Sequence, residues 1–101
     1  MIGFYEVESL DLNPKEKLKV IYNDEASPYQ LIDVRTAPEV HEKALANSVW
    51  IELASLPDQA NQLNRTQPFA LACASGVRSM IAASWMKANG FKNVVSVKPN
   101  V

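Results

Sequence analysis

The stretch FALACASGVRS, at residues 69–79, decides the fold class of this chain. Its first five residues, 69–73, form a nearly unbroken apolar run, which is typical of a strand buried on both faces of a parallel sheet. After it, apolar side chains recur at helical spacing from about Arg78 to Asn89, and Gly90 is placed to be the C-cap. The stretch therefore predicts a buried strand that passes through a short loop into an amphipathic helix.

On either side of this stretch, strand patterns alternate with helix patterns along the chain. We expect strands at 3–7, 29–34, 48–53 and 94–97, and helices at 13–23, 36–44 and 56–63. This alternation, with short loops, predicts an α/β domain around a mostly parallel sheet. A chain of 101 residues suits one compact domain, so we expect residues 1–101 to form a single domain.

Several conspicuous side chains fit this pattern as structural residues. We expect the helix to bury an apolar face that includes Ile81, and we expect packing roles for four further residues: Trp50, Met80, Trp85 and Met86. Ser79, directly after the loop, is expected to help cap the helix. His41 is expected to be an exposed helical residue.

The composition indicates an ordinary soluble protein and argues against two classes of partner. The chain is 48% hydrophobic and 21% charged, with a formal net charge of −1, which argues against a nucleic-acid binder. No apolar run has the length of a membrane span, and the N-terminal residues lack the pattern of a signal peptide. We therefore expect a cytoplasmic protein with no nucleic-acid or membrane partner.

The charges are distributed unevenly along the chain. All eleven acidic residues lie at or before Asp58, whereas residues 59–101 hold five basic residues and no acidic one. A functional site in this second half would favour a small anion. A basic solvated face explains the same pattern equally well.

The counts of cysteine and histidine limit disulfide and metal chemistry. Cys73 is the only cysteine and His41 the only histidine, so an intrachain disulfide and a four-cysteine zinc site are excluded. We expect no metal and no cofactor.

The segment from Cys73 to Ser79 lies where chemistry is most easily placed in such a fold. The carboxyl ends of parallel strands form the ligand crevice, and a loop entering a helix there points its N–H groups at a common centre. Gly76 permits the tight or positive-φ backbone that such a cradle requires. A Cys73 thiolate would be stabilised there, and the fork of Arg78 suits an anion. The rival interpretation, an inert core cysteine, is the less economical account of this combination.

Two segments resemble the rhodanese-like domain family. They are LIDVR at 31–35, followed by Pro38-Glu39-Val40, and CASGVRS at 73–79, followed by a helix up to Gly90-Phe91. The resemblance extends over about residues 29–97. It implies a mostly parallel five-stranded sheet flanked by helices on both faces. It also implies a thiosulfate sulfurtransferase, which moves sulfane sulfur from a small anionic donor to cyanide or a cellular thiol.

The resemblance also implies roles for individual residues. Cys73 would be the catalytic sulfur carrier, and the substrate-binding cradle would consist of Ala74, Ser75, Gly76, Val77 and Arg78. Arg78 would close the cradle and bind the donor anion, and Ser75 could add a hydroxyl donor. Relatives often carry a basic residue where this chain has Ala74, so donor affinity is expected to be reduced.

The same resemblance gives Asp33 and Arg35 a supporting role. They match the family's Asp-Val-Arg element. From the residues themselves we expect them to hold a loop beside the site through an ion pair or hydrogen bonds.

Two other functions stay open on the sequence. The first is a sulfur-relay, redox or protein-binding module, which would hold a persulfide for one dedicated protein and turn over small donors poorly. The second is a cysteine phosphatase or arsenate reductase on the same scaffold, whose loop is one residue longer between cysteine and arginine; the shorter loop from Cys73 to Arg78 favours sulfur. The acceptor is expected to be a thiol, and a thioredoxin-like protein is one candidate.

Overall fold

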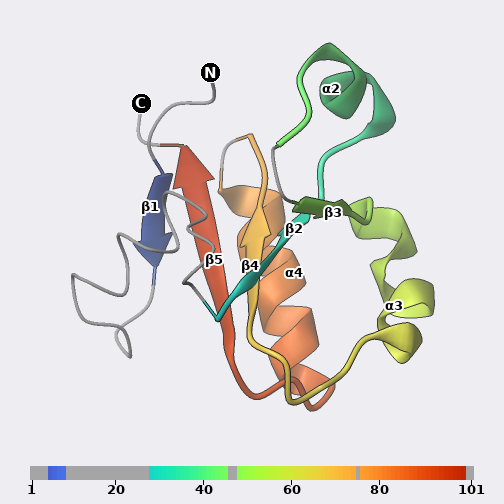
Figure 1. The fold of residues 1–101 in the computed structure, drawn as a ribbon, viewed down its shortest axis with the longest axis vertical. Coiled ribbons are helices and arrows are strands. Elements are labelled where there is room, and N and C mark those ends of the chain that lie inside the picture. The colour runs from blue at the N-terminus through green and yellow to red at the C-terminus, as the bar shows by residue number, and fades with distance from the viewer. Residues whose placement is uncertain (1–4, 9–27, 46–47, 75, 100–101) are drawn as a thin grey trace.

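The computed structural model describes residues 5–8, 28–45, 48–74 and 76–99, which build a five-stranded sheet (Figure 1). The strands are β1 (Tyr5–Glu8), β2 (Gln30–Asp33), β3 (Ser48–Trp50), β4 (Phe69–Ala72) and β5 (Val94–Pro99), in the spatial order β1-β5-β4-β2-β3. Four of them run parallel, and β1 pairs with β5 in the antiparallel direction. The mostly parallel sheet predicted from the sequence is confirmed.

Strand β4 occupies the centre of the sheet, and its sequence explains why. It pairs with β2 on one side and β5 on the other, so every residue from Phe69 to Ala72 is buried. Successive side chains point to opposite faces. Leu71 joins one core cluster, whereas Ala70 and Ala72 join a second cluster on the other face. An unbroken apolar run is what a strand covered on both faces requires.

The described helices are α2 (Ala37–Glu42), α3 (Leu56–Gln59) and α4 (Val77–Ala88), with 3-10 turns at Leu53–Ser55 and Ala60–Gln62. α3 and α4 cover one face of the sheet, where Leu56, Ala82 and Met86 pack against Leu71 in one core cluster. The helix predicted for 13–23 lies outside the described residues. None of the described helices is long and apolar enough to cross a membrane.

Three apolar residues that were expected to pack lie instead at the surface. Trp50 is 44% exposed, since it belongs to the edge strand β3, which ends there rather than at residue 53. Met80 and Ile81 are 50% and 53% exposed. Apolar residues occur on more than one side of α4, so spacing alone did not identify the inward face. That face consists of Ser79, Ala82, Ala83 and Met86.

Other structural predictions agree with the structure more closely. Met86 is fully buried, Trp85 packs partly buried against the core, and His41 is exposed on α2. Gly90 follows the end of α4 with φ +91°, and Phe91 folds back to donate its N–H to the Met86 carbonyl at 3.0 Å. The predicted 56–63 helix is shorter and continues as a 3-10 turn.

Two methionines of α4 provide a matched test of this packing. We expect Met86→Ala to lower the free energy of unfolding by about 2–5 kcal/mol, because it opens a cavity under α4. Met80→Ala removes the same atoms from an exposed position and should change stability by about 0.5 kcal/mol or less. Urea unfolding followed by circular dichroism measures both, and equal losses would contradict the assigned inward face.

Candidate active site

Cys73 lies at the carboxyl end of the central strand, directly before the loop that enters α4. Its side chain is 2% exposed. Gly76 is the N-cap residue of α4 and has φ +89°, a conformation that other residues adopt only with strain. The fold therefore brings a cysteine from β4 and the first turn of α4 together at one point.

Backbone N–H groups of described residues at the start of this helix donate hydrogen bonds to the Cys73 sulfur. The N–H of Gly76 lies 3.0 Å from Sγ, and the N–H of Ser79 lies 3.3 Å from it. Amides in the first turn have no partner within the helix, and a capping side chain usually accepts from them. Gly76 has no side chain, so the sulfur takes that place. Two donors and the positive end of the helix dipole favour a thiolate over a thiol.

Ser79 lies closer to the Cys73 sulfur than its predicted capping role implied. It is the third residue of α4 and is fully buried, with Oγ 3.5 Å from Cys73 Sγ and 2.8 Å from Ser96 Oγ. Neither serine was predicted as a site residue. The signal in the sequence was spacing: Ser79 lies three and four residues before Ala82 and Ala83, so it shares their buried face.

Arg78 has its guanidinium fork on a carboxylate of another helix. Its two terminal nitrogens donate to the two carboxylate oxygens of Glu39, on α2, at 2.6 and 2.9 Å. Glu39 also accepts from the N–H and hydroxyl of Thr36, at 3.0 and 2.9 Å. The expected anion-binding fork is thus engaged by a carboxylate, although Glu39 was not predicted as a site residue.

The charges of this pair reinforce each other. The hydrogen bond from Arg78, followed by that from the Thr36 backbone, lowers the pKa of Glu39 to about 2. The hydrogen bond to Glu39 in turn raises the pKa of Arg78, and negative charge on Cys73 adds to that rise. Arg78 is therefore close enough to Cys73 for the two groups to interact electrostatically.

Asp33 and Arg35 form the ion pair that was expected of them. Asp33 is 1% exposed at the end of β2, and its carboxylate accepts from the Arg35 Nε at 3.0 Å and terminal nitrogen at 2.9 Å. The same terminal nitrogen donates to the Lys43 carbonyl at 2.6 Å. The pair thus ties the end of β2 to the segment that follows α2, beside the loop that holds Cys73.

The remaining cradle residues have simpler surroundings. Ala74 is exposed, Val77 is 61% exposed, and Ser75 lies outside the described residues. The described parts of the chain contain no group of three or more His, Cys, Asp or Glu side chains that could hold a metal ion.

Comparison with known proteins gives consistent matches. The family model described as "Rhodanese-like domain" matches residues 14–98. The Bacillus subtilis protein named "Putative sulfur carrier protein YrkF" is 35% identical over 78 residues, which cover 77% of this chain and 42% of that protein. "Putative sulfurtransferase YtwF", from the same organism, is 34% identical over 64 residues, 63% of this chain and 62% of that one. This chain thus spans less than two thirds of the length of each of these two relatives.

A solved structure agrees with these sequence matches. The crystal structure of a rhodanese-like domain protein from Staphylococcus aureus superposes with a TM-score of 0.68 and 32% identity. The match covers 80% of this chain and 78% of the other.

The Glu39–Arg78 pair predicts how charged reagents reach Cys73. Iodoacetate is an anion that the Glu39 carboxylate repels, whereas iodoacetamide is neutral. In Glu39→Gln we therefore expect the rate of Cys73 alkylation by iodoacetate, divided by the rate with iodoacetamide, to rise about fivefold, because roughly 1 kcal/mol of this repulsion is removed. Both reagents report on one thiol, since Cys73 is the only cysteine. Glu42→Gln, an exposed position on the same helix, is the control, and an unchanged ratio in Glu39→Gln would contradict the pairing.

The same pair predicts a pH dependence of stability. The pKa of Glu39 is about 2 in the folded protein, below its ordinary 4.5. The ionised carboxylate therefore contributes fully to the free energy of unfolding above pH 4.5, and this contribution is lost as the pH falls through 2. Both side chains are about 30% exposed, so we expect Glu39→Gln to cost only about 0.2–1 kcal/mol at pH 7. Unfolding of both proteins at pH 7 and pH 2 measures this. If the free energies of unfolding of the wild type and Glu39→Gln differ by the same amount at pH 7 and at pH 2, the predicted pH dependence is wrong.

Proposed function

The chain belongs to the rhodanese-like domain family, and on this premise we propose that it transfers sulfane sulfur through a persulfide on Cys73. The observation that carries the proposal is the pair of N–H groups, from Gly76 and Ser79, that converge on the Cys73 sulfur at the start of α4. A thiolate is the form of cysteine that attacks a sulfur atom, and this arrangement favours it.

The first step loads the sulfur. The Cys73 thiolate attacks the outer sulfur of thiosulfate, forming a new S–S bond while the bond to the sulfonate sulfur breaks. The bonding electron pair leaves with sulfite, so the charges balance without a proton transfer. Preorganised N–H donors stabilise the negative sulfur as it changes partner.

The second step unloads it. An acceptor, either cyanide or a thiolate, attacks the outer sulfur of the persulfide. The S–S bond breaks, and its electron pair returns to Cys73 Sγ, which regains its original charge. No oxidant or reductant is consumed in the cycle.

The position of Arg78 supports a second candidate, a dedicated sulfur relay. A small anionic donor must compete with Glu39 for the Arg78 fork, and Ala74 offers no further positive charge. Weak affinity for thiosulfate follows from these two features. A protein partner that delivers or receives the sulfur through its own contacts would not depend on that affinity. The names of the two Bacillus relatives, a putative carrier and a putative transferase, are compatible with either candidate.

We propose a protein thiol as the acceptor, of which a thioredoxin-like protein is one example. The cytoplasm is the compartment that suits this chemistry, because it keeps an unpaired thiol such as Cys73 reduced.

Intact-protein mass spectrometry tests the proposal. We expect thiosulfate to add one sulfur atom to the wild type and none to Cys73→Ser, and cyanide then to remove it as thiocyanate. Rapid turnover with thiosulfate would identify the enzyme, and a persulfide that cyanide discharges slowly would identify the relay. An unmodified Cys73 after exposure both to thiosulfate and to a low-molecular-weight persulfide would overturn both candidates.

A further inference from the structure

Behind Cys73, on the side of the sheet covered by α4, two buried hydroxyl groups form a chain that ends at the sulfur. Ser79 is fully buried, and its Oγ lies 3.5 Å from Cys73 Sγ. Ser96, on β5, is 6% exposed, and its Oγ lies 2.8 Å from that of Ser79. Serine is an unusual choice at both positions, because the surrounding residues of the same core face are apolar.

Ser79 has more partners than it has protons. Its Oγ lies 3.0 Å from the Gly76 carbonyl and 3.2 Å from the Val97 carbonyl, in addition to Ser96 and the sulfur. A hydroxyl carries one proton and two acceptor lone pairs, so it donates to one of these partners at a time. The direction of the Ser79 proton must therefore depend on whether Cys73 is a thiol or a thiolate.

When Cys73 is a thiol, its S–H donates a hydrogen bond to Ser79 Oγ, and the Ser79 hydroxyl donates to a backbone carbonyl. In the thiolate form the sulfur has no proton, and a hydrogen bond donated to a charged acceptor is roughly twice as strong as one donated to a neutral carbonyl. The Gly76 carbonyl loses little in the exchange, since it also accepts the Met80 N–H at 3.2 Å. Ser96 can then donate to the freed lone pair of Ser79.

We propose that Ser79 and Ser96 form a hydroxyl relay that stabilises the Cys73 thiolate. Ser79 donates to the sulfur directly, and Ser96 is a positioning residue that donates to Ser79 and so turns its proton toward the sulfur. Hydrogen bonds in such a chain polarise one another, so the effect of Ser96 reaches Cys73 through Ser79.

The relay bears on both steps of sulfur transfer, and this consequence rests on the proposed function. Cys73 acts as attacking thiolate in the first step and as leaving thiolate in the second. In the second step the S–S bond breaks and its electron pair settles on Sγ, where the Ser79 hydroxyl donates a hydrogen bond without giving up its proton. Discharge of the persulfide should depend on the relay as much as loading does.

Charged groups around Cys73 also affect its ionisation, and the test must keep them constant. Arg78 lies on α4, Asp33 and Arg35 lie at and after the end of β2, and Glu39 lies on α2. None of these four side chains is altered in the serine variants, so a change in the behaviour of Cys73 reports on the hydroxyl groups.

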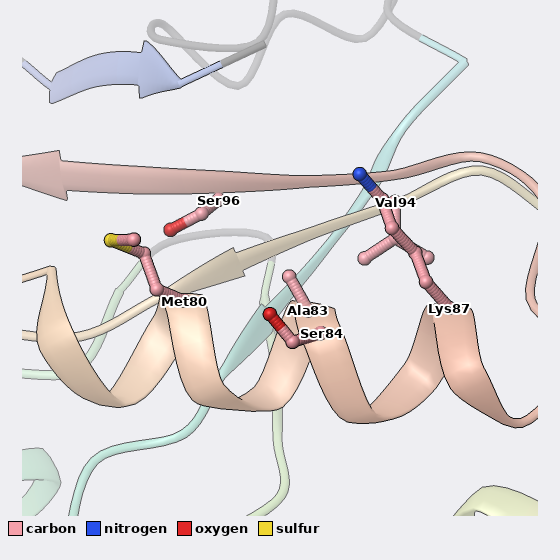
Figure 2. Close-up of a pocket in the computed structure, with 6 residues that line it drawn as sticks. All are labelled: Met80, Ala83, Ser84, Lys87, Val94 and Ser96. Atoms are coloured by element: carbon pink, nitrogen blue, oxygen red, sulfur yellow. The ribbon is translucent and has the colours of Figure 1, made fainter.

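Ser96 is the better position to vary, because a pocket adjoins it. The pocket, of about 170 Å³, lies between α4 and β5, and it is lined by Met80, Ala83, Ser84, Lys87, Val94 and Ser96 (Figure 2). In Figure 2 the Ser96 side chain extends from β5 toward α4. An additional methyl group in Ser96→Thr has space there, so this variant retains the hydroxyl without overpacking the core. Ser84, across the same pocket and exposed, provides a control.

The experiment is the pH profile of Cys73 alkylation by iodoacetamide, which needs no sulfur donor. We expect the midpoint to rise by about one to two pH units in Ser79→Ala, which removes a hydrogen bond to a charged group. Ser96→Ala should raise the midpoint by about 0.2–0.5 pH unit. Ser96→Thr, which keeps the hydroxyl, and the control Ser84→Ala should both keep the wild-type midpoint. Circular dichroism verifies that each variant is folded.

The double variant decides whether the two hydroxyls act in series. If Ser96 acts through Ser79, Ser96→Ala has no further effect in the Ser79→Ala background. The relay would be overturned if Ser96→Ala raised the midpoint in the Ser79→Ala background by as much as it does in the wild type. It would also be overturned if the pH profile of Ser96→Ala alone matched that of the wild type. These outcomes are separate from the proposed function. A shifted profile without persulfide formation would refute sulfur transfer alone, and normal persulfide formation with no shift would refute the relay alone.

Discussion

The start of α4 depends on an atom that is not part of the helix. Gly76 leaves the N-cap without a side chain, and the Cys73 sulfur, from the end of β4, accepts the first-turn N–H groups in its place. On the proposed function, helix capping and activation of the nucleophile are therefore the same interaction. The central position of β4, the positive φ of Gly76 and the inward face of α4 are all needed to place that atom, and so the fold and the site cannot be separated.

Helix α2, whose Glu39 pairs with Arg78, is held by charge rather than by packing. None of the residues of α2 is buried. The helix is fixed by Arg78 through Glu39. The segment after it is fixed by Arg35 through the Lys43 carbonyl, with Asp33 holding Arg35 in place, and by Leu45, which is buried in the second core cluster. The same arrangement reduces the positive charge available to a donor anion. Structural support and, on the proposed function, substrate preference thus depend on the same few side chains.

The sequence predicted those features that arise from local pattern. The apolar run at 69–73 predicted a strand buried on both faces, Gly76 and Gly90 were recognised as positions of special backbone, and the Asp33–Arg35 pair was anticipated. What it did not predict depends on contacts between distant segments. Glu39 meets Arg78 across 39 residues, and Ser79 meets Ser96 across 17. Met80 and Ile81 are exposed because the opposite side of α4 faces the sheet. The sequence has apolar residues on several sides of this helix, so it did not specify which side faces inward.

The shallow attachment of α2 has an evolutionary consequence. None of the residues of α2 is buried, so we expect most substitutions there to cost little stability. Exchange of Glu39 itself would alter the charge beside Cys73 without disturbing β4 or α4. On the proposed function, substitutions in this one six-residue helix could thus change the preference for a sulfur donor while β4 and α4 stay unchanged.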